Sequence, residues 1–267
     1  MSARAFIGIA GWSLWISVAA AEPKRIVTLS PALAEMVWEI DGTLDRLVGV
    51  SEHTDFPAGA RALPTVGPFH QTSVEAVAKL KPDLVLATRD GNPEAGVKRI
   101  QALGIPVSVV DTHSIEQWLG AYAQVGTSIG RSKEAAEVAA SVRRELEKIP
   151  KWGVERAPAV IFFVLQESPL MTAGNGTFLS EALNRLGGQN LGDEAGQGYP
   201  RVAREWIVRK SATRAIHFVS LVPKAGSKPP FWSKLPNART VDVPHDLLSR
   251  PSARLIEGLR ILRRAIP

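Results

Sequence analysis

Short apolar runs alternate with amphipathic segments along most of this chain of 267 residues. The runs DLVLA at 83–87 and AVIFFVL at 159–165 place hydrophobic side chains at consecutive positions, which is typical of strands buried on both faces of a parallel sheet. The segment NPEAGVKRIQALG at 92–104 instead repeats its apolar positions with a helical period and ends at a glycine, a common helix stop. This alternation predicts an α/β fold with parallel sheets covered by helices.

The predicted elements form two groups separated by one long helix. In the first group, strands are predicted at 25–30, 46–51, 83–87 and 105–111, and helices at 32–40, 73–80, 92–104 and 114–130. In the second group, strands are predicted at 159–165, 214–220 and 239–244, and helices within 174–188, 203–211 and 251–266. The segment 132–149 between them contains neither Gly nor Pro and predicts a helix of about 27 Å. We therefore expect an N-terminal lobe at 22–130, an inter-lobe helix at 131–150 and a C-terminal lobe at 151–267.

A short phrase occurs in both groups of elements. SVEAVAKLKPDLVLA begins at Ser73 and AREWIVRKSATRAIHF begins at Ala203; each predicts a short basic helix that leads into a strand. Aligning Glu75 with Glu205 gives an offset of 205 − 75 = 130, and the same offset matches Lys79 with Arg209. The repeat predicts two lobes of similar plan.

The N-terminal segment has the composition of an export signal. Residues 1–21 contain Arg4, then an apolar run, and then Ala19, Ala20 and Ala21. These features match the n-region, h-region and cleavage site of a signal peptide, so we expect export to the periplasm and cleavage after about Ala21. A membrane anchor is the alternative, but Gly and Ser interrupt a run that is marginal against the roughly 20 residues needed to span a bilayer. The chain contains no cysteine, which excludes disulfides, cysteine nucleophiles and cysteine metal ligands.

Charge and motifs argue against nucleic-acid binding and against catalysis. The formal charge is +6, and removal of Arg4 with the signal leaves 6 − 1 = +5, with Lys and Arg scattered along the chain. We interpret the basic C-terminal stretch RILRRAIP as the last turn of a helix, where cations suit the macrodipole, and expect no nucleic-acid partner. The motifs of nucleophile elbows, zinc proteases, P-loops and dinucleotide sites do not occur, so a secreted α/β hydrolase is only a minor alternative.

Polar loops follow the predicted strands, at the edge where open α/β sheets bind ligands. In the first lobe these loops include SEHTDFP at 51–57 and TRDGN at 88–92, and in the second QESPLMTAGNG at 166–176 and VPHDLLSRP at 243–251. Facing loops of two lobes would form a cleft between them. The five histidines are far apart in the sequence, and no His-rich loop predicts a protein-bound metal.

Each candidate residue in these loops also has an ordinary structural role. His53 can be a polar turn residue, and Phe69, in a Gly-Pro turn, can cover either a ligand or the core. Met171 is of a type that often fills cores. Asp246 and Arg250 are four residues apart and can pair across one helical turn.

Several of these segments resemble one known family. RIVTLSPALAE, LVGVSEHTDFP, SVEAVAKLKPDLVLATRDGN and LGIPVSVVD are similar to periplasmic substrate-binding proteins of ABC importers, and the resemblance covers essentially the whole mature chain. The subclass is the one with a rigid inter-lobe helix, which serves cobalamin, haem and iron-siderophores. ATRDGN, GYPRVARE and HDLLSRPSAR are more similar to its cobalamin-binding members. The resemblance implies two Rossmann-like lobes with parallel central sheets, one long rigid α-helix joining them, and a ligand cleft between the lobes.

The resemblance also implies which residues line a cobalamin cleft. Phe69 stands where the family has a tryptophan against the corrin, and His53 where it has a tyrosine. Tyr199 stands at another tryptophan position and Met171 at a phenylalanine, while Thr88 departs from a family tryptophan. The implied ligand-binding set is His53, Phe69, Arg89, Met171, Tyr199, Asp246 and Arg250.

The function implied by the resemblance is capture of cobalamin, or a related corrinoid, and its delivery to an ABC transporter permease. In this family one glutamate on each lobe docks onto arginines of the permease dimer, and Glu75 and Glu205 match those positions. Alternatively, Glu75 is only a first-turn acid beside the N-cap Ser73, which stabilises a helix by about 0.3–1 kcal/mol. We expect a monomeric receptor without catalytic residues, resident cofactor or metal.

Two other ligands of the same transporter class remain open. Haem needs an axial ligand to iron, which His53 or Tyr199 could supply. Anionic ferric siderophores would favour Arg89 and Arg250. With any of these ligands, a single continuous helix between the lobes predicts little bending on binding.

Overall fold

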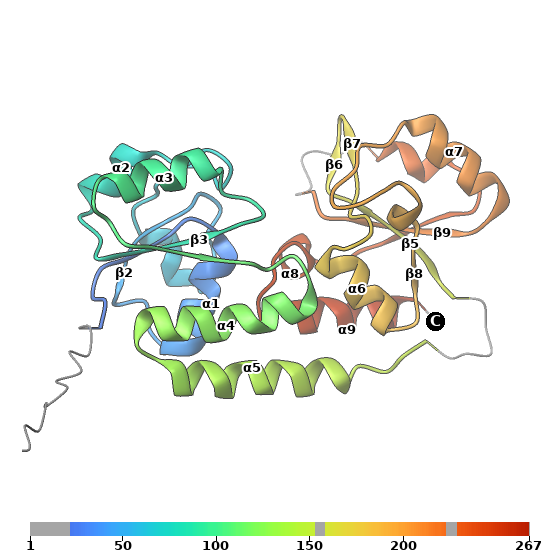
Figure 1. Ribbon diagram of the computed structural model, residues 1–267. Coiled ribbons are helices and arrows are strands. Elements are labelled where there is room, and N and C mark those ends of the chain that lie inside the picture. The colour runs from blue at the N-terminus through green and yellow to red at the C-terminus, as the bar shows by residue number, and fades with distance from the viewer. Residues whose placement is uncertain (1–21, 153–157, 223–228, 267) are drawn as a thin grey trace, which may run out of the picture.

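The structure of the protein is a computed structural model that describes residues 22–152, 158–222 and 229–266. Two lobes stand side by side above a layer of helices, and each lobe has a central sheet with helices on its faces (Figure 1). The predicted signal peptide at 1–21 lies outside the described residues. None of the helices that the structure describes combines the length and the hydrophobicity of a membrane-spanning segment.

The N-terminal lobe contains a four-stranded parallel sheet in the order β2-β1-β3-β4. Its strands are β1 (Ile26–Thr28), β2 (Leu47–Val50), β3 (Leu84–Thr88) and β4 (Val107–Val110). Its helices are α1 (Pro31–Asp41), the 3-10 helix η1 (Ala58–Ala62), α2 (Val74–Lys79), α3 (Glu94–Ala102) and α4 (Ile115–Ile129), after which the chain continues into α5 (Ser132–Glu147). The strands and helices predicted from the sequence of this lobe are confirmed, with shifts of a few residues at their ends.

The C-terminal lobe contains a second four-stranded parallel sheet, in the order β10-β9-β5-β8. Its strands are β5 (Val160–Val164), β8 (Gln189–Asn190), β9 (Ile216–Ser220) and β10 (Ala238–Val241), and a small hairpin pairs β6 (Gln166–Glu167) with β7 (Leu170–Met171). Its helices are α6 (Phe178–Arg185), α7 (Arg204–Thr213), α8 (His245–Leu248) and α9 (Leu255–Ala265), with 3-10 helices η2 (Leu191–Glu194) and η3 (Phe231–Lys234). The hairpin, β8 and α8 were not predicted, because each is too short to show a period in the sequence.

The two sheets have the same topology. The order β8-β5-β9-β10 in the C-terminal lobe corresponds to β2-β1-β3-β4 in the N-terminal lobe. The repeated phrases occupy equivalent places. In the N-terminal lobe α2 leads into β3, which lies beside the first strand β1, and in the C-terminal lobe α7 leads into β9, which lies beside the first strand β5. The repeat in the sequence is therefore a repeat in the structure.

The layer beneath the lobes contains more than the predicted connecting helix. The helix predicted at 132–149 is α5, which ends at Glu147, and α4 lies alongside it (Figure 1). Ser114 and Gln117 form a capping box that starts α4. The backbone N–H of Ile115 in that first turn also donates to Glu181 Oε2 of α6, at 2.8 Å. A carboxylate of the C-terminal lobe therefore lies at the positive end of α4, a helix of the N-terminal lobe.

The hydrophobic core is continuous between the lobes. One cluster, here called the shared core, includes Ile26, Trp118, Leu146, Phe163 and Leu259, which come from both sheets and from α4, α5 and α9. Successive residues of a strand face opposite sides of its sheet, so Val27, next to Ile26, and Phe162, next to Phe163, belong to two separate outer clusters, one per lobe. The inner face of each sheet thus packs on one common helical layer.

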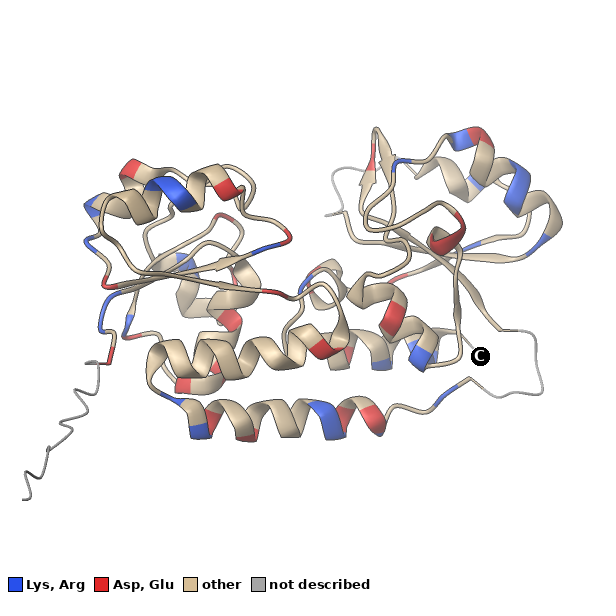
Figure 2. Ribbon diagram, viewed as in Figure 1, with Lys and Arg blue, Asp and Glu red and all other residues tan. Residues whose placement is uncertain are grey.

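Charged residues are spread over both lobes and the helical layer in the view of Figure 2, with both signs interspersed. This distribution agrees with the scattered Lys and Arg of the sequence.

Candidate functional site

A cavity of about 570 Å³ lies between the two lobes. The N-terminal lobe contributes residues that follow the carboxyl ends of its strands, and the C-terminal lobe contributes the β6–β7 region, the start of α6 and the segment around α8. Its lining consists of Ser30, Pro31, Ala32, Glu52, His53, Pro68, Phe69, His70, Thr88, Asp90, Thr112, Leu165, Met171, Phe178, Leu179, Tyr199, His245, Ser249, Arg250 and Pro251. The predicted cleft between lobes is confirmed.

The structure brings together most, but not all, of the residues predicted for the site. Those that line the cavity are His53, Phe69, Met171, Tyr199 and Arg250. Arg89 and Asp246 are both described by the structure and do not line it. The Arg89 side chain is 72% exposed, and its Nε lies 3.6 Å from Asp111 Oδ2. Asp246 instead forms an ion pair with Arg254.

The suggested pairing of Asp246 with Arg250 is wrong. Arg250 Nη1 instead donates to Glu35 Oε1 at 2.7 Å and to Asp55 Oδ1 at 2.6 Å, both in the N-terminal lobe. Burial alone would raise the pKa of Asp55, but the hydrogen bond and charge of Arg250 outweigh that effect and lower it. The guanidinium is thus engaged by acids of the opposite lobe.

Phe69 is held by a loop that sequence analysis did not single out for this role. A Cβ atom added to Gly91 would lie 1.5 Å from Cζ of Phe69, so the ring lies directly against the glycine backbone. The buried Asn92 side chain donates from Nδ2 to the carbonyl oxygens of Leu29 at 2.9 Å and Phe69 at 2.8 Å, and accepts from the Thr88 backbone N–H at 2.8 Å. The adjacent Gly and Asn after a predicted strand were a signal of a tight turn, but not of this aromatic contact.

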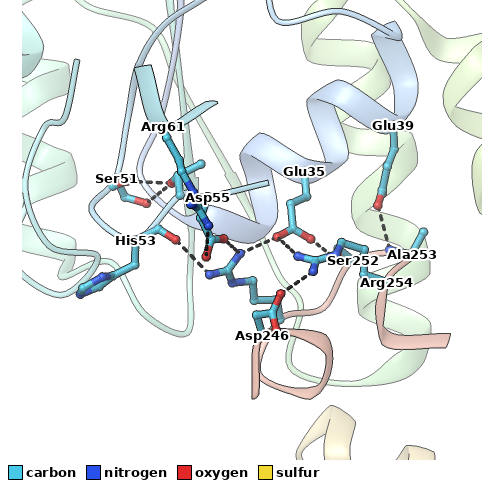
Figure 3. Close-up of polar contacts among 12 residues, drawn as sticks. Glu35, Glu39, Ser51, His53, Asp55, Arg61, Asp246, Ser252, Ala253 and Arg254 are labelled. Atoms are coloured by element: carbon cyan, nitrogen blue, oxygen red, sulfur yellow. Dashed lines mark hydrogen bonds and ion pairs between the residues drawn. The ribbon is translucent and has the colours of Figure 1, made fainter. Parts of the chain in front are cut away.

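His53 has an unusual backbone conformation. Its φ is +65°, in the left-handed region that few residues other than glycine and asparagine adopt. Its carbonyl oxygen accepts from Arg250 Nη2 at 2.9 Å, which helps to hold the loop in this conformation (Figure 3). The exposed imidazole belongs to the cavity lining.

Histidines that are distant in the sequence gather at the cavity. His53, His70 and His245 line it, and the ring of His113 meets Tyr199 edge-on with 6.2 Å between ring centroids. Among the described residues, no group of three or more His, Cys, Asp or Glu side chains is placed to hold a metal ion. Burial, with a smaller effect of Asp90, raises the pKa of Tyr199 to about 12, so its phenol is neutral at physiological pH.

The two predicted docking glutamates occupy equivalent and exposed positions. Glu75 is the second residue of α2 and Glu205 the second residue of α7, and these helices lie on the side of the molecule away from α4 and α5 (Figures 1 and 2). Ser73 caps α2 by accepting from the Ala76 backbone N–H at 3.2 Å. Within the described part of the chain, neither glutamate has an ion-pair partner, whereas many other acids do.

Comparison with known proteins agrees with this architecture. The profile of the periplasmic binding protein family matches residues 26–251. The vitamin B12-binding protein of Salmonella typhi is 29% identical over 245 residues, which cover 91% of this chain and 90% of the relative.

Two solved structures share the fold. The periplasmic vitamin B12 binding protein of Vibrio cholerae has a TM-score of 0.72 and 22% identity, with 91% of this chain and 96% of that chain covered. A periplasmic heme binding protein from Pseudomonas aeruginosa has a TM-score of 0.77 and 22% identity, with 91% and 92% covered. The fold of this chain is shared by both structures, and the match over residues 26–251 shows that the chain belongs to the periplasmic binding protein family.

Proposed function

We propose that this protein captures cobalamin, or a related corrinoid, in the periplasm and delivers it to an ABC transporter permease. The observation that carries the proposal is the inter-lobe cavity of about 570 Å³, whose exposed lining surface is mostly apolar and includes the rings of Phe69, Phe178 and Tyr199. A large, nearly flat macrocycle with peripheral amides requires a wide apolar cleft and a few polar groups at its edge. Curated relatives named vitamin B12-binding proteins, such as that of Salmonella typhi, support the choice of ligand.

In this proposal the two lobes supply different walls of one site. Phe69 from the N-terminal lobe and Tyr199 from the C-terminal lobe offer aromatic surface to the macrocycle, and Met171 adds an adaptable apolar contact. The hydroxyl of Ser249 at the same cavity can hydrogen-bond to an amide side chain of the ligand. No catalytic step is required of any of these residues.

Titration calorimetry of residues 22–267 with cyanocobalamin tests the proposal. We expect saturable binding at one site, which Phe69→Ala and Tyr199→Ala each weaken by roughly tenfold or more, because truncation of a buried aromatic anchor commonly costs above about 1 kcal/mol. Absence of binding to any corrinoid, together with clear binding of haem, would reject cobalamin as the ligand.

Haem is the second candidate, and the gathered histidines favour it. Imidazoles of His53, His70 and His245, with the phenol of Tyr199, are available at the cavity to a ligand that brings its own metal. Addition of hemin would then shift its Soret band, and His53→Ala or Tyr199→Phe would abolish the shift. A protein that binds cyanocobalamin and leaves the hemin spectrum unchanged rejects this candidate.

A ferric siderophore has less support. Its negative charge would require free cations in the cavity, but Arg89 does not line it and Arg250 is already paired with Glu35 and Asp55. Glu35 and Asp55 offset the positive charge of Arg250, which an anionic ligand would need.

We also propose that Glu75 and Glu205 anchor the two lobes to the permease. This proposal is supported by the equivalent positions of the two residues, by their exposure and by their lack of partners among the described residues. Unpaired carboxylates on both lobes suit a partner that presents one basic site to each.

A further inference from the structure

One short segment of the C-terminal lobe forms hydrogen bonds and ion pairs with acidic side chains of the N-terminal lobe. The segment 250–254 connects α8 to α9 and lies against α1 (Figure 3). Glu35 of α1 is completely buried and accepts from Arg250 Nη1 at 2.7 Å, from Ser252 Oγ at 2.5 Å and from Arg254 Nη1 at 3.3 Å. A buried carboxylate without such partners would be costly, so burial of Glu35 strongly favours the arrangement in which the two lobes are in this contact.

Arg250 extends this contact to a loop of the N-terminal lobe. Its Nη1 also donates to Asp55 Oδ1 at 2.6 Å and its Nη2 donates to the carbonyl oxygen of His53 at 2.9 Å. One rigid planar guanidinium thereby joins α1, the loop after β2 and the segment after α8. We call the group of Glu35, Asp55, Arg250 and the His53 carbonyl the inter-lobe clamp.

The clamp borders the cavity. Arg250 and its neighbours Ser249 and Pro251 line the cavity from the C-terminal lobe, and His53 lines it from the N-terminal lobe. Glu35 and Asp55, which hold Arg250, do not line it, although the structure describes both. The clamp therefore joins two walls of the cavity.

The known partners of Arg250 argue against a direct role in holding the ligand. Its side chain is 10% exposed, and both of its terminal nitrogens already donate to protein oxygens. Two carboxylates offset its charge. Release of these bonds to reach a ligand would leave Glu35 buried with fewer partners.

We infer that Arg250 is a positioning residue, which fixes the width of the cavity and the place of the His53 loop by clamping the two lobes together. The inference deepens the proposed function and depends on it only for the identity of the ligand.

The first test needs no ligand. The chain has no cysteine, so Lys79→Cys and Arg209→Cys, on the equivalent helices α2 and α7, can carry spin labels without background. Double electron–electron resonance should give a narrow distance distribution in the unliganded parent and a shifted or broader one after Arg250→Met. Arg264→Met is the matched control, because Arg264 pairs with Glu257 within α9 and should leave the distribution unchanged. An unchanged distribution in the Arg250 variant overturns the inference.

A second variant guards against misfolding. Arg250→Met leaves the buried Glu35 without its main cationic partner and can therefore fail to fold. In that case the double variant Glu35→Gln, Arg250→Met removes both charges, and its spin-label distances are measured in the same way. A parental distribution in the folded double variant overturns the inference as well.

Asp55→Asn separates positioning from direct ligand contact. It weakens the clamp without removing a cavity-lining residue, so we expect affinity for cyanocobalamin to fall by roughly tenfold or more as a wall of the site shifts. If Arg250 instead binds the ligand, freeing it from Asp55 leaves affinity unchanged or raises it, and that result overturns the inference.

Arg250→Lys should restore the parental spin-label distances only in part, because lysine keeps the positive charge but lacks the planar guanidinium that donates to several partners at once. A parent that binds no corrinoid rejects the proposed function, while the spin-label distances still decide the clamp.

Discussion

Single residues shape the cavity wall, and Gly91 does so by lacking a side chain. A Cβ atom at Gly91 would lie 1.5 Å from Cζ and 2.2 Å from Cε2 of Phe69. Gly91→Ala therefore has to displace the ring or the loop. We expect its affinity for cyanocobalamin to fall by roughly tenfold, a change of about 1.4 kcal/mol, with a smaller effect on the melting temperature.

Gly96→Ala is the matched control for this variant. Gly96 lies in α3 with no atom within 4 Å of an added Cβ, so alanine there should keep affinity and stabilise the helix by about 0.5–1 kcal/mol. The effect of Gly91→Ala should also disappear in a Phe69→Ala background, because both changes act on the same ring. Additive losses in the double variant would contradict this account.

Glu39 should make stability depend on pH. Burial raises its pKa from 4.5 to about 7, with a smaller contribution from nearby Glu35, and the hydrogen bond from Tyr122 opposes the shift. Because the folded protein holds this proton more tightly than the unfolded chain, the stabilisation is complete below about pH 4.5 and is lost as the pH rises through about 7. The full difference is on the order of 3 kcal/mol.

Glu39→Gln removes this titration and keeps an acceptor for the backbone N–H of Ala253, which Glu39 Oε1 accepts at 3.1 Å. Urea unfolding at pH 5 and pH 8 should show a larger loss of stability in the parent than in the variant. Equal losses in both proteins would show that Glu39 does not titrate in this range.

At the scale of elements, two features besides the inter-lobe clamp resist relative motion of the lobes. The helices α4 and α5 run side by side beneath them, and the shared core joins both sheets to this layer. Bending would strain the hydrogen bonds of the helices and expose apolar surface at roughly 25 cal/mol per Å². We expect the radius of gyration from small-angle scattering to change little when ligand is added, and a large contraction would be incompatible with this packing.

At the scale of the whole molecule, the two exposed glutamates predict a docking surface. If Glu75 and Glu205 anchor the lobes, the double change to Lys should leave ligand affinity intact and strongly reduce transport in reconstituted vesicles, because like charges would then face the permease arginines. Single changes to Ala should reduce transport less.

Glu134→Lys is the control for docking. Glu134 is also an exposed first-turn acid, but on α5, on the opposite side of the molecule from α2 and α7. Its loss should alter stability by about 0.3–1 kcal/mol through the helix dipole and leave transport unchanged. Normal transport by the double Lys variant that still binds ligand would remove the support for docking.

The sequence by itself determined the plan of the protein. Hydrophobic periodicity is local, so it predicted most strands and helices, and the offset of 130 between Glu75 and Glu205 predicted two similar lobes. It also indicated the loops that contain His53 and Met171, because ligand sites lie beyond the carboxyl ends of strands.

Only the tertiary structure decided which side chains meet. The local rule of four-residue spacing suggested that Asp246 pairs with Arg250, whereas packing of the lobes gives Arg250 a buried partner in Glu35, 250 − 35 = 215 residues away. The same packing gathers histidines that the sequence separates, and within the N-terminal lobe Arg89 pairs with Asp111 rather than lining the cavity. Such contacts depend on burial and on the register of two lobes, and no spacing within one segment encodes them.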